Sequence, residues 1–301
     1  MLRAVAAMNV RRGLLSMVAI AAVVAVGCGG RSSAGGNPGG YNGNGGKNGN
    51  NNGGPYGGDD PGSSLSLASK AGLGNYLVSP SGLTLYYFAL DIPTAAGQAA
   101  VSNCTGGCLP IWPIFHVDRP VAGAGLNASD FGEFVRSDGA KQTTFRGWPL
   151  YYFAGDTAAG DTKGDNLGDP RPTDLWFVLK DPFYAALVLT KNGGPSLYLA
   201  DPAGRALYVF ASDTVGSAAS APVSACTDPG CLGAWPVFAA GSGTLPTGLD
   251  PAKLTSFTRP DGAKQSAFDG HPLYYFAGDT SPGATTGRGV DGFDTANPSS
   301  L

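Results

Sequence analysis

Few residues of this chain could carry out chemistry, and the cysteines are the most clearly arranged among them. Cys104 and Cys108 are separated by Thr-Gly-Gly, and Cys226 and Cys231 by Thr-Asp-Pro-Gly. These turn-forming residues allow the Cα atoms of each pair to come within the about 4.4–6.8 Å that a disulfide requires. Two local disulfides are therefore expected, and bridges between the pairs or a four-thiolate metal site are the open alternatives. Neither spacing is the Cys-x-x-Cys of thiol–disulfide exchange enzymes.

Four aspartates end four copies of one pattern, Gly-x-x-Leu-Tyr-x-Phe-Ala-x-Asp. Each carboxylate could cap the turn after its strand, accept a hydrogen bond from a motif tyrosine, or ligate a cation. We favour capping, because calcium loops gather several oxygen ligands within a dozen residues and only residues 156–165 faintly resemble one. The repeated Tyr, Phe and Asp residues are Tyr86, Phe88, Asp91, Tyr151, Phe153, Asp156, Tyr208, Phe210, Asp213, Tyr274, Phe276 and Asp279.

The two histidines do not mark a repeated catalytic group. His271 stands where the preceding copy of the pattern has Trp148. His116 follows Trp112 in an apolar, strand-like run, and we expect it to be a surface or packed structural histidine. No Gly-x-Ser-x-Gly, His-Glu-x-x-His or phosphate-loop sequence is present. The sequence thus predicts a protein that is not an enzyme and has neither a cofactor nor a metal site.

The motif aromatic residues have two possible uses. Tyrosine and phenylalanine near acidic and amide side chains could stack on a sugar or another planar ligand. Leu85 and Tyr87 point to one side of the expected strand, and Tyr86 and Phe88 point to the other. Because both faces are apolar, the strand should be interior, which favours core packing of the aromatic rings.

The elements that position these residues form two long copies. Residues 76–82 match residues 198–204, and residues 134–142 match residues 257–265. We place copy 1 at residues 73–187 and copy 2 at residues 188–301. Each copy holds two occurrences of the motif, so the chain has four half-repeats.

The local signals predict an all-β fold of tandem antiparallel repeats. Asp138-Gly139 and Asp261-Gly262 lie between short alternating runs, which is a strong hairpin signal. Sustained helical periodicity is absent after the N-terminal segment, so few helices are expected. Four turn-linked strand pairs fit a propeller-like ring or a two-sheet sandwich, and we favour the propeller-like arrangement.

Residues 1–27 have the layout of a secretion signal. A basic start with three arginines precedes an apolar stretch that is shorter than the about 20 residues of a membrane span. Small residues stand directly before Cys28, as in a bacterial lipobox, so we expect cleavage there and lipidation of Cys28. An ordinary secretory signal with an incidental cysteine is the alternative. Residues 28–72, rich in Gly and Asn, are expected to form a disordered tether with an r.m.s. length of roughly 35–40 Å.

Charge is sparse in this chain. Charged residues make up 14% of it, against about 25% in an ordinary soluble domain, and the formal net charge is −3. Without basic clusters, nucleic-acid binding is not expected. A surface built mainly from Gly, Ser, Thr and Asn fits an extracytoplasmic protein.

The combined motifs resemble those of the bacterial secreted-repeat lipoproteins described by a Yx(FWY)xxD motif. All four occurrences match, as do the cysteine pair followed by Trp-Pro and the Asp-Gly-x-x-Gln segment before Pro-Leu-Tyr-Tyr-Phe. The resemblance covers the chain from about Leu73 onward and implies a tandem-repeat lipoprotein whose biochemical role is unassigned. One departure concerns the C-terminus, where copy 1 has the strand-like residues 175–179 and copy 2 only residues 293–297. The last strand of copy 2 is therefore expected to be missing or supplied by another segment.

The sequence thus predicts a lipid-anchored module of the cell envelope with a binding or scaffolding role. Its expected partners are the membrane, through the anchor, and an envelope protein or a carbohydrate. Gly29 stands where an aspartate accompanies inner-membrane retention in many Gram-negative bacteria, which favours the outer membrane or cell surface in such an organism. The alternatives are a redox or metal-handling envelope protein that uses its cysteine pairs and, more weakly, a hydrolase that uses acidic pairs.

Overall fold

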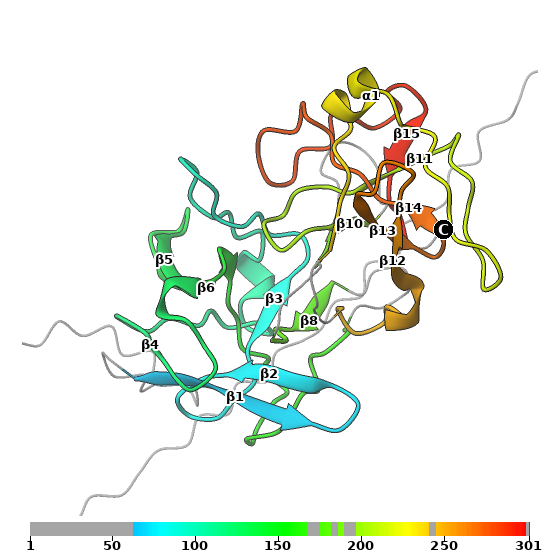
Figure 1. Ribbon diagram of the computed structural model, residues 1–301. Coiled ribbons are helices and arrows are strands. Elements are labelled where there is room, and N and C mark those ends of the chain that lie inside the picture. Colours follow the sequence, from blue (N-terminus) through cyan, green and yellow to red (C-terminus); the bar gives the residue numbers. More distant parts are fainter. Residues whose placement is uncertain (1–62, 168–174, 182–185, 190–196, 241–244, 299–300) are drawn as a thin grey trace, which may run out of the picture. The chain divides into compact units, whose positions relative to one another are not determined.

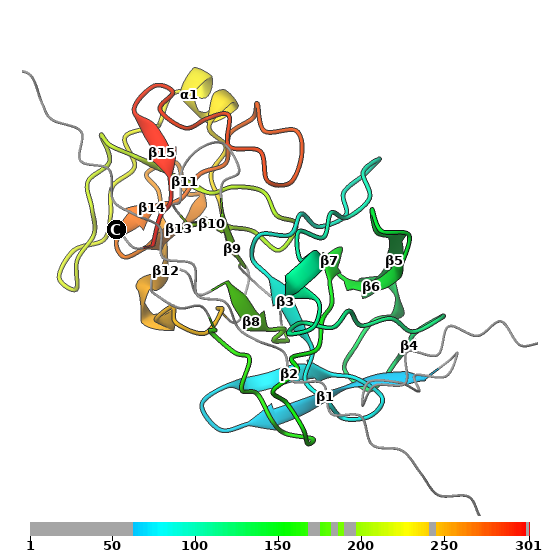
Figure 2. The same ribbon diagram turned by 180° about the vertical axis from the view of Figure 1, so that it is seen from behind.

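The computed structural model describes residues 63–167, 175–181, 186–189, 197–240, 245–298 and 301. Cys28 and the tether up to residue 62 lie outside the described residues. Short strands and long turns make up the described chain, with one six-residue α-helix, α1 (Pro229–Ala234), and three 3₁₀ turns. Figures 1 and 2 show this all-β character, with copy 1 in blue to green and copy 2 in green to red. Among the described residues, no helix has the length and apolar character needed to cross a bilayer.

The first copy contributes three small sheets. One has the order β2-β1-β4, a second pairs β3 with β8, and a third has the order β5-β6-β7. The pairings are antiparallel except that of β1 with β4, which is parallel. The bounds are β1 Ser64–Lys70, β2 Gly74–Val78, β3 Tyr86–Phe88, β4 Val121–Ala122, β5 Phe131–Val135, β6 Lys141–Phe145, β7 Trp148–Pro149 and β8 Trp176–Val178, with 3₁₀ turns at Gly106–Cys108 and Ala128–Asp130.

The second copy repeats this plan. Its sheets pair β10 with β9 and β11 with β15, and join β12-β13-β14, all antiparallel. The bounds are β9 Ala186–Leu189, β10 Leu197–Ala200, β11 Tyr208–Phe210, β12 Leu254–Thr258, β13 Lys264–Phe268, β14 His271–Pro272 and β15 Phe293–Thr295, with a 3₁₀ turn at Pro251–Lys253.

Sheets of two or three strands correct our preference for a propeller, whose blades are four-stranded. The described residues form sandwich-like repeats without a closed barrel. The expected hairpins are present: β5–β6 and β12–β13 each turn at an Asp-Gly pair, with Gly139 and Gly262 both at φ 83°. That positive φ is the conformation in which glycine avoids the steric cost of a side chain.

Two boundaries differ from the sequence expectation. Strand β1 lies inside the segment expected to be tether, because Leu65 and Leu67 alternate with serines and Leu65 is fully buried. Strand β9 spans the expected boundary between residues 187 and 188. It pairs with β10 as β1 pairs with β2, so it begins copy 2.

The last strand of copy 2 is present, which corrects the expectation that it is missing or replaced. Residues Phe293–Thr295 form β15 and pair with β11, as β8 pairs with β3 in copy 1. Phe293 replaces Trp176 in this position, and both side chains are buried. Strand β15 has only three residues, of which one is aromatic, and this run was too short to be recognised as a strand from the sequence.

The motif strand β3 is interior, as expected. It pairs with β8 on one side and bridges Tyr151 on the other. Leu85 and Tyr87 belong to a core that contains residues of both copies, whereas Tyr86 and Phe88 belong to a second core within copy 1. The indole Nε1 of Trp148 donates to the carbonyl oxygen of Pro202 at 2.8 Å, which adds a polar contact between the copies.

Candidate functional sites: a buried network, a groove and a surface cluster

The two motif strands of each copy lie against each other. The backbone N–H of Tyr86 donates to the carbonyl of Tyr151 at 2.9 Å, and the reverse bond is 3.0 Å long. In copy 2, Tyr208 and Tyr274 exchange the same two bonds at 2.9 Å each. The two halves of each copy therefore meet at their motif tyrosines.

Each tyrosine hydroxyl donates to the motif aspartate of the other half. Tyr86 Oη donates to Asp156 Oδ2 at 2.6 Å, and Tyr151 Oη donates to Asp91 Oδ2 at 2.7 Å. In copy 2 the bonds are Tyr208 to Asp279 at 2.5 Å and Tyr274 to Asp213 at 2.9 Å. The repeated motif thus builds two reciprocal tyrosine–aspartate pairs in each copy.

The second carboxylate oxygen of each aspartate accepts a backbone N–H. Asp91 accepts from Asn103 at 2.7 Å and Asp213 from Ala225 at 2.7 Å. The donors to Asp156 and Asp279 are the backbone N–H groups of the residues seven positions further on, both at 2.9 Å. Each aspartate therefore holds a tyrosine, which was one of the three roles left open by the sequence. Each also fixes a loop that lies seven or twelve residues further on than the aspartate, beyond the turn that it was expected to cap.

Burial shifts the pKa values of these groups. It raises the pKa of Tyr86 and Tyr151 far above the usual range, with the neighbouring aspartates adding to the shift, and raises that of Tyr274 to about 12. Burial also raises the pKa of Asp156 and Asp213, although their hydrogen bonds oppose it. Unionised tyrosines are the hydrogen-bond donors that these pairs need.

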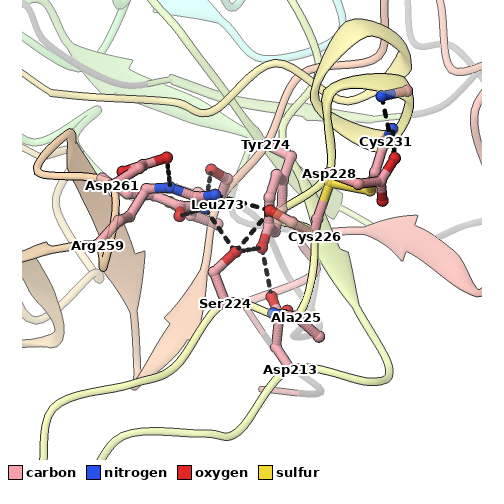
Figure 3. The surroundings of a disulfide bond; sticks show 12 residues. Asp213, Ser224, Ala225, Cys226, Asp228, Cys231, Arg259, Asp261, Leu273 and Tyr274 are labelled. Carbon is pink, nitrogen blue, oxygen red and sulfur yellow. Dashed lines mark hydrogen bonds and ion pairs between the residues drawn. A yellow bond between two sulfur atoms is a disulfide. The ribbon is translucent and has the colours of Figure 1, made fainter.

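An arginine extends the pairs toward the disulfides. In copy 2, shown in Figure 3, Arg259 Nη1 donates to Ser224 Oγ at 2.5 Å and to Gln265 Oε1 at 2.7 Å. Its Nη2 donates to the carbonyl oxygen of Cys226 at 2.7 Å. Ser224 Oγ lies 2.6 Å from Tyr274 Oη, which joins the arginine to the tyrosine. Copy 1 has the same contacts through Arg136, Ser102, Gln142, Cys104 and Tyr151. We call these residues, with the tyrosine–aspartate pairs, the motif network.

The sulfur atoms of the four cysteines are used in local disulfides. Cys104 is joined to Cys108 and Cys226 to Cys231, with Cα–Cα distances of 5.4 and 5.6 Å. Disulfide sulfurs are not thiolate ligands, so this oxidised form offers no four-cysteine metal site. The carbonyl of the first cysteine in each pair accepts from the network arginine, and the disulfide loop is thereby tied to the motif network.

The aromatic residues pack on one another. Trp112 stacks on Trp176 with ring centroids 3.8 Å apart, and Trp176 stacks on Phe88 at 4.2 Å. Phe153 lies at 4.6 Å from Trp112. Copy 2 has the same order, from Phe210 through Phe293 and Trp235 to Phe276, at 4.2, 3.7 and 4.5 Å. These rings form core packing rather than an open platform for a sugar.

An open groove of about 690 Å³ lies on copy 2. One wall is the loop of residues 216–222, and the other includes Lys253, Thr255 and Ser256 around the start of β12. Strand β12 is an edge strand of its sheet. Lys253 Nζ lies 2.5 Å from Asp269 Oδ2 in an ion pair that also lines the groove. Hydroxyl groups and a paired charge thus line a space large enough for a small polar ligand.

A surface cluster in copy 1 contains His116, Asp118 and Glu133. His116 Nε2 lies 2.8 Å from Glu133 Oε2 and 3.6 Å from Asp118 Oδ1. Lys141 Nζ lies 2.9 Å from Glu133 Oε1 and 3.7 Å from Asp118 Oδ1. The hydrogen bond from His116, followed by that from Lys141, lowers the pKa of Glu133.

Sequence reasoning treated His116 as structural and did not connect it to Glu133. His116 and Asp118 form a visible His-x-Asp pattern, but Glu133 comes from a different strand. The fold brings them together because Phe115 and Val117 form hydrogen bonds with Thr143 on β6, and Thr143 is also the partner of Glu133 across β5–β6.

None of the motif aspartates belongs to the grouping of possible metal ligands found among the described residues.

The family comparison confirms the resemblance inferred from the motifs. A family model described as a secreted repeat of unknown function matches residues 132–180 and 255–296. The two segments run from the β5–β6 and β12–β13 hairpins to the closing strands β8 and β15. No curated protein and no solved structure matches the chain. The match indicates an extracellular repeat protein.

Proposed function

We propose that this secreted-repeat chain is a lipid-anchored module of the cell envelope that binds or scaffolds other molecules and does not catalyse a reaction. The motif network carries the proposal. Its four tyrosine–aspartate pairs and two arginines are satisfied by one another and by backbone groups, in both copies. Residues committed to internal hydrogen bonds stabilise a rigid scaffold, which leaves the loops and the groove for recognition.

Lipidation at Cys28 supplies the anchor. The basic start, the apolar stretch and the small residues before Cys28 support this assignment. One acyl chain gives only weak membrane binding, whereas several chains on one cysteine make the attachment durable. In an organism with two membranes, Gly29 favours the outer membrane or the cell surface.

The anchor is tested by replacing Cys28 with Ser in the full chain. We expect loss of palmitate labelling, and either release into the soluble fraction or retention of the uncleaved precursor. The double variant Cys104→Ser/Cys108→Ser is the matched control and should keep the label, since neither cysteine follows a signal segment. Unchanged labelling of Cys28→Ser would rule out the anchor.

The groove on copy 2 is the proposed binding surface. Its hydroxyl groups and the Lys253–Asp269 pair can hydrogen-bond a ligand, while its alanines and Pro222 offer apolar contacts. We propose an envelope carbohydrate, which presents both hydroxyl groups and C–H faces. A ligand bound there would lie beside the edge of β12, which among the described residues pairs only with β13. An envelope protein that adds a strand to this edge is the second occupant that the groove could take.

Soluble cell-wall glycan fragments provide the test, by titration into the mature protein. Thr255→Trp should fill the groove and reduce binding at least tenfold, whereas Thr258→Trp is the matched control because Thr258 is exposed on the same strand but outside the groove. Equal effects of the two variants would argue against the groove. Turnover of the fragments would argue for the hydrolase alternative.

A further inference from the structure

We propose that His116, Asp118 and Glu133 form a binding site for a divalent transition-metal ion, with Zn²⁺ as the ion to test. Their ligand atoms all lie within 4.8 Å of one another. A tetrahedral Zn²⁺ with bonds of about 2.0–2.2 Å holds its ligands roughly 3.4 Å apart. The distances from His116 Nε2 to Glu133 and Asp118, 2.8 and 3.6 Å, lie on either side of that value. Small side-chain adjustments would therefore complete the site.

The backbone around the cluster is fixed by hydrogen bonds. The Thr143 N–H donates to the carbonyl of Phe115 at 3.0 Å, and Thr143 Oγ1 accepts from the N–H of Val117 at 3.0 Å. These bonds hold the segment that carries His116 and Asp118 against β6. Glu133 lies on β5 directly across from the same Thr143. Two ligand-bearing segments are thus held on one strand, which reduces the entropy that a metal would have to remove on binding.

A cation already occupies the neighbourhood of the two carboxylates. Lys141 Nζ lies 2.9 Å from Glu133 and 3.7 Å from Asp118, and the lysine side chain is half exposed. The carboxylates would exchange this flexible ammonium for a doubly charged ion, and Lys141 would extend into solvent. Lys141 is therefore a competitor of the metal, and its removal should strengthen metal binding.

Copy 2 lacks every ligand of the site. The residues that match His116, Asp118 and Glu133 are Ala239, Gly241 and Ser256, while Lys264 matches Lys141. Lys264 Nζ donates to Thr258 Oγ1 at 2.5 Å instead of pairing with a carboxylate. Both copies thus have the lysine, whereas only copy 1 has the three candidate ligands.

The donor set selects the kind of ion. One imidazole nitrogen and two carboxylates suit Zn²⁺ and similar ions, and three protein ligands leave a fourth position for water or a ligand atom. His116 would bind through an unprotonated Nε2, with the ring proton on Nδ1. The proposed site differs from the sequence expectation of no metal, because its three ligands converge only when residues 115–118 pack against the β5–β6 hairpin.

Isothermal titration of Zn²⁺ into the mature, disulfide-intact protein tests the proposal. We expect one ion per chain, bound with a dissociation constant well below the millimolar range. His116→Ala and Glu133→Gln should each weaken binding more than the about 10–100-fold caused by loss of an outer-shell partner. Lys141→Gln should tighten binding.

Three controls separate the site from general surface binding. His271→Gln removes the other histidine of the chain and should leave binding unchanged. Lys264→Gln, the matched lysine in copy 2, should not tighten it. Free-thiol titration should show intact disulfides, which excludes the cysteines. Zn²⁺ that binds His116→Ala as well as the parent protein, or no binding below millimolar Zn²⁺, would overturn the proposal, provided that thermal melts show folded variants.

Discussion

The interiors of the two copies are nearly identical, whereas their surfaces differ. Each network arginine donates to a glutamine oxygen at 2.7 Å in both copies and to the first cysteine's carbonyl at 2.8 or 2.7 Å. The aromatic stacks agree within a few tenths of an ångström. In contrast, the ion pair Asp130–Arg146 of copy 1 occupies the same positions as the ion pair Lys253–Asp269 of copy 2. The acidic and the basic residue have exchanged places between the copies. The repeated residues therefore specify the scaffold, and the differences mark where each copy can do something of its own.

The largest expected effect tests the aromatic stacks. Phe88 and Phe210 occupy matching positions, but Phe88 is buried and Phe210 is half buried. We expect Phe88→Ala to lower the unfolding free energy by about 3–5 kcal/mol and Phe210→Ala by less. Denaturant unfolding of the full chain measures both. An equal or greater loss for Phe210→Ala would contradict burial as the cause of the difference.

The next effect concerns the reciprocal pairs. Tyr151→Phe removes the donor to Asp91, which is fully buried, and Tyr274→Phe removes the donor to Asp213, which is half buried. Hydrogen bonds to charged groups contribute about 1.5–3 kcal/mol, so Tyr151→Phe should lie at the upper end and Tyr274→Phe at the lower. Tyr198→Phe is a control, because Tyr198 is fully buried and its hydroxyl has no hydrogen-bond partner among the described residues. Losses of equal size in all three variants would show that the hydroxyls do not stabilise the halves through the aspartates.

Removal of either disulfide should have an effect that is intermediate in size and equal in the two copies. The closed loops are short, with sequence separations of 4 and 5, and loop-closure entropy for such lengths is about 2 kcal/mol. The double serine variants of each pair should lose about this much unfolding free energy. If the cysteines serve redox chemistry instead, reduction should proceed under mild thiol conditions with little change in stability, which mass spectrometry of alkylated thiols would reveal.

The smallest effect is a difference in pH dependence. Contacts with Lys163 and two backbone N–H groups lower the pKa of Asp161 to about 2. Since its unfolded pKa is about 3.9, this carboxylate stabilises the fold above that pH and loses the effect as pH falls toward 2. Asp161→Ala introduces the residue found at the matching position, Ala284, and should flatten the stability curve in that acid window.

Asp156 and Asp213 should act in the opposite direction. Burial raises their pKa, so the folded protein binds their protons more tightly than the unfolded chain does. Their contribution is largest below about pH 3.9 and falls as pH rises through the raised folded value. Asp156→Asn and Asp213→Asn should remove this decline. Melts at several pH values that show an unchanged curve for both would contradict the assigned burial.

Sequence patterns predicted the parts of the fold that depend on neighbouring residues. The Asp-Gly turns, the interior motif strand and the proximity of each cysteine pair all follow from contacts within a dozen residues. The reciprocal pairs could not be predicted, because Tyr86 and Asp156 are 70 residues apart and only the pairing of Tyr86 with Tyr151 brings them together. Pairing with a tyrosine was one of the three roles considered for each aspartate. The sequence did not indicate that the tyrosine would come from the other half of the copy.

The same limit explains the missed parts. Strand β15 has three residues and lacks the long apolar run of its counterpart, so its pairing with β11 supplies the stabilisation that its own sequence does not. Glu133 and His116 become neighbours only when β5 and β6 pair. The parallel contact of β1 with β4, two residues long, likewise joins distant segments without a local signal.

The crosswise exchange of tyrosine and aspartate has the symmetry of a two-fold contact within one chain. Each half offers one donor and one acceptor, and each receives the same in return, as identical subunits do in an isologous dimer. A single half expressed alone would present an unpaired carboxylate and an unpaired hydroxyl at an open strand. Two such halves could satisfy each other across a true dimer axis, so a motif of this kind lends itself to assembly between chains as readily as to duplication within one.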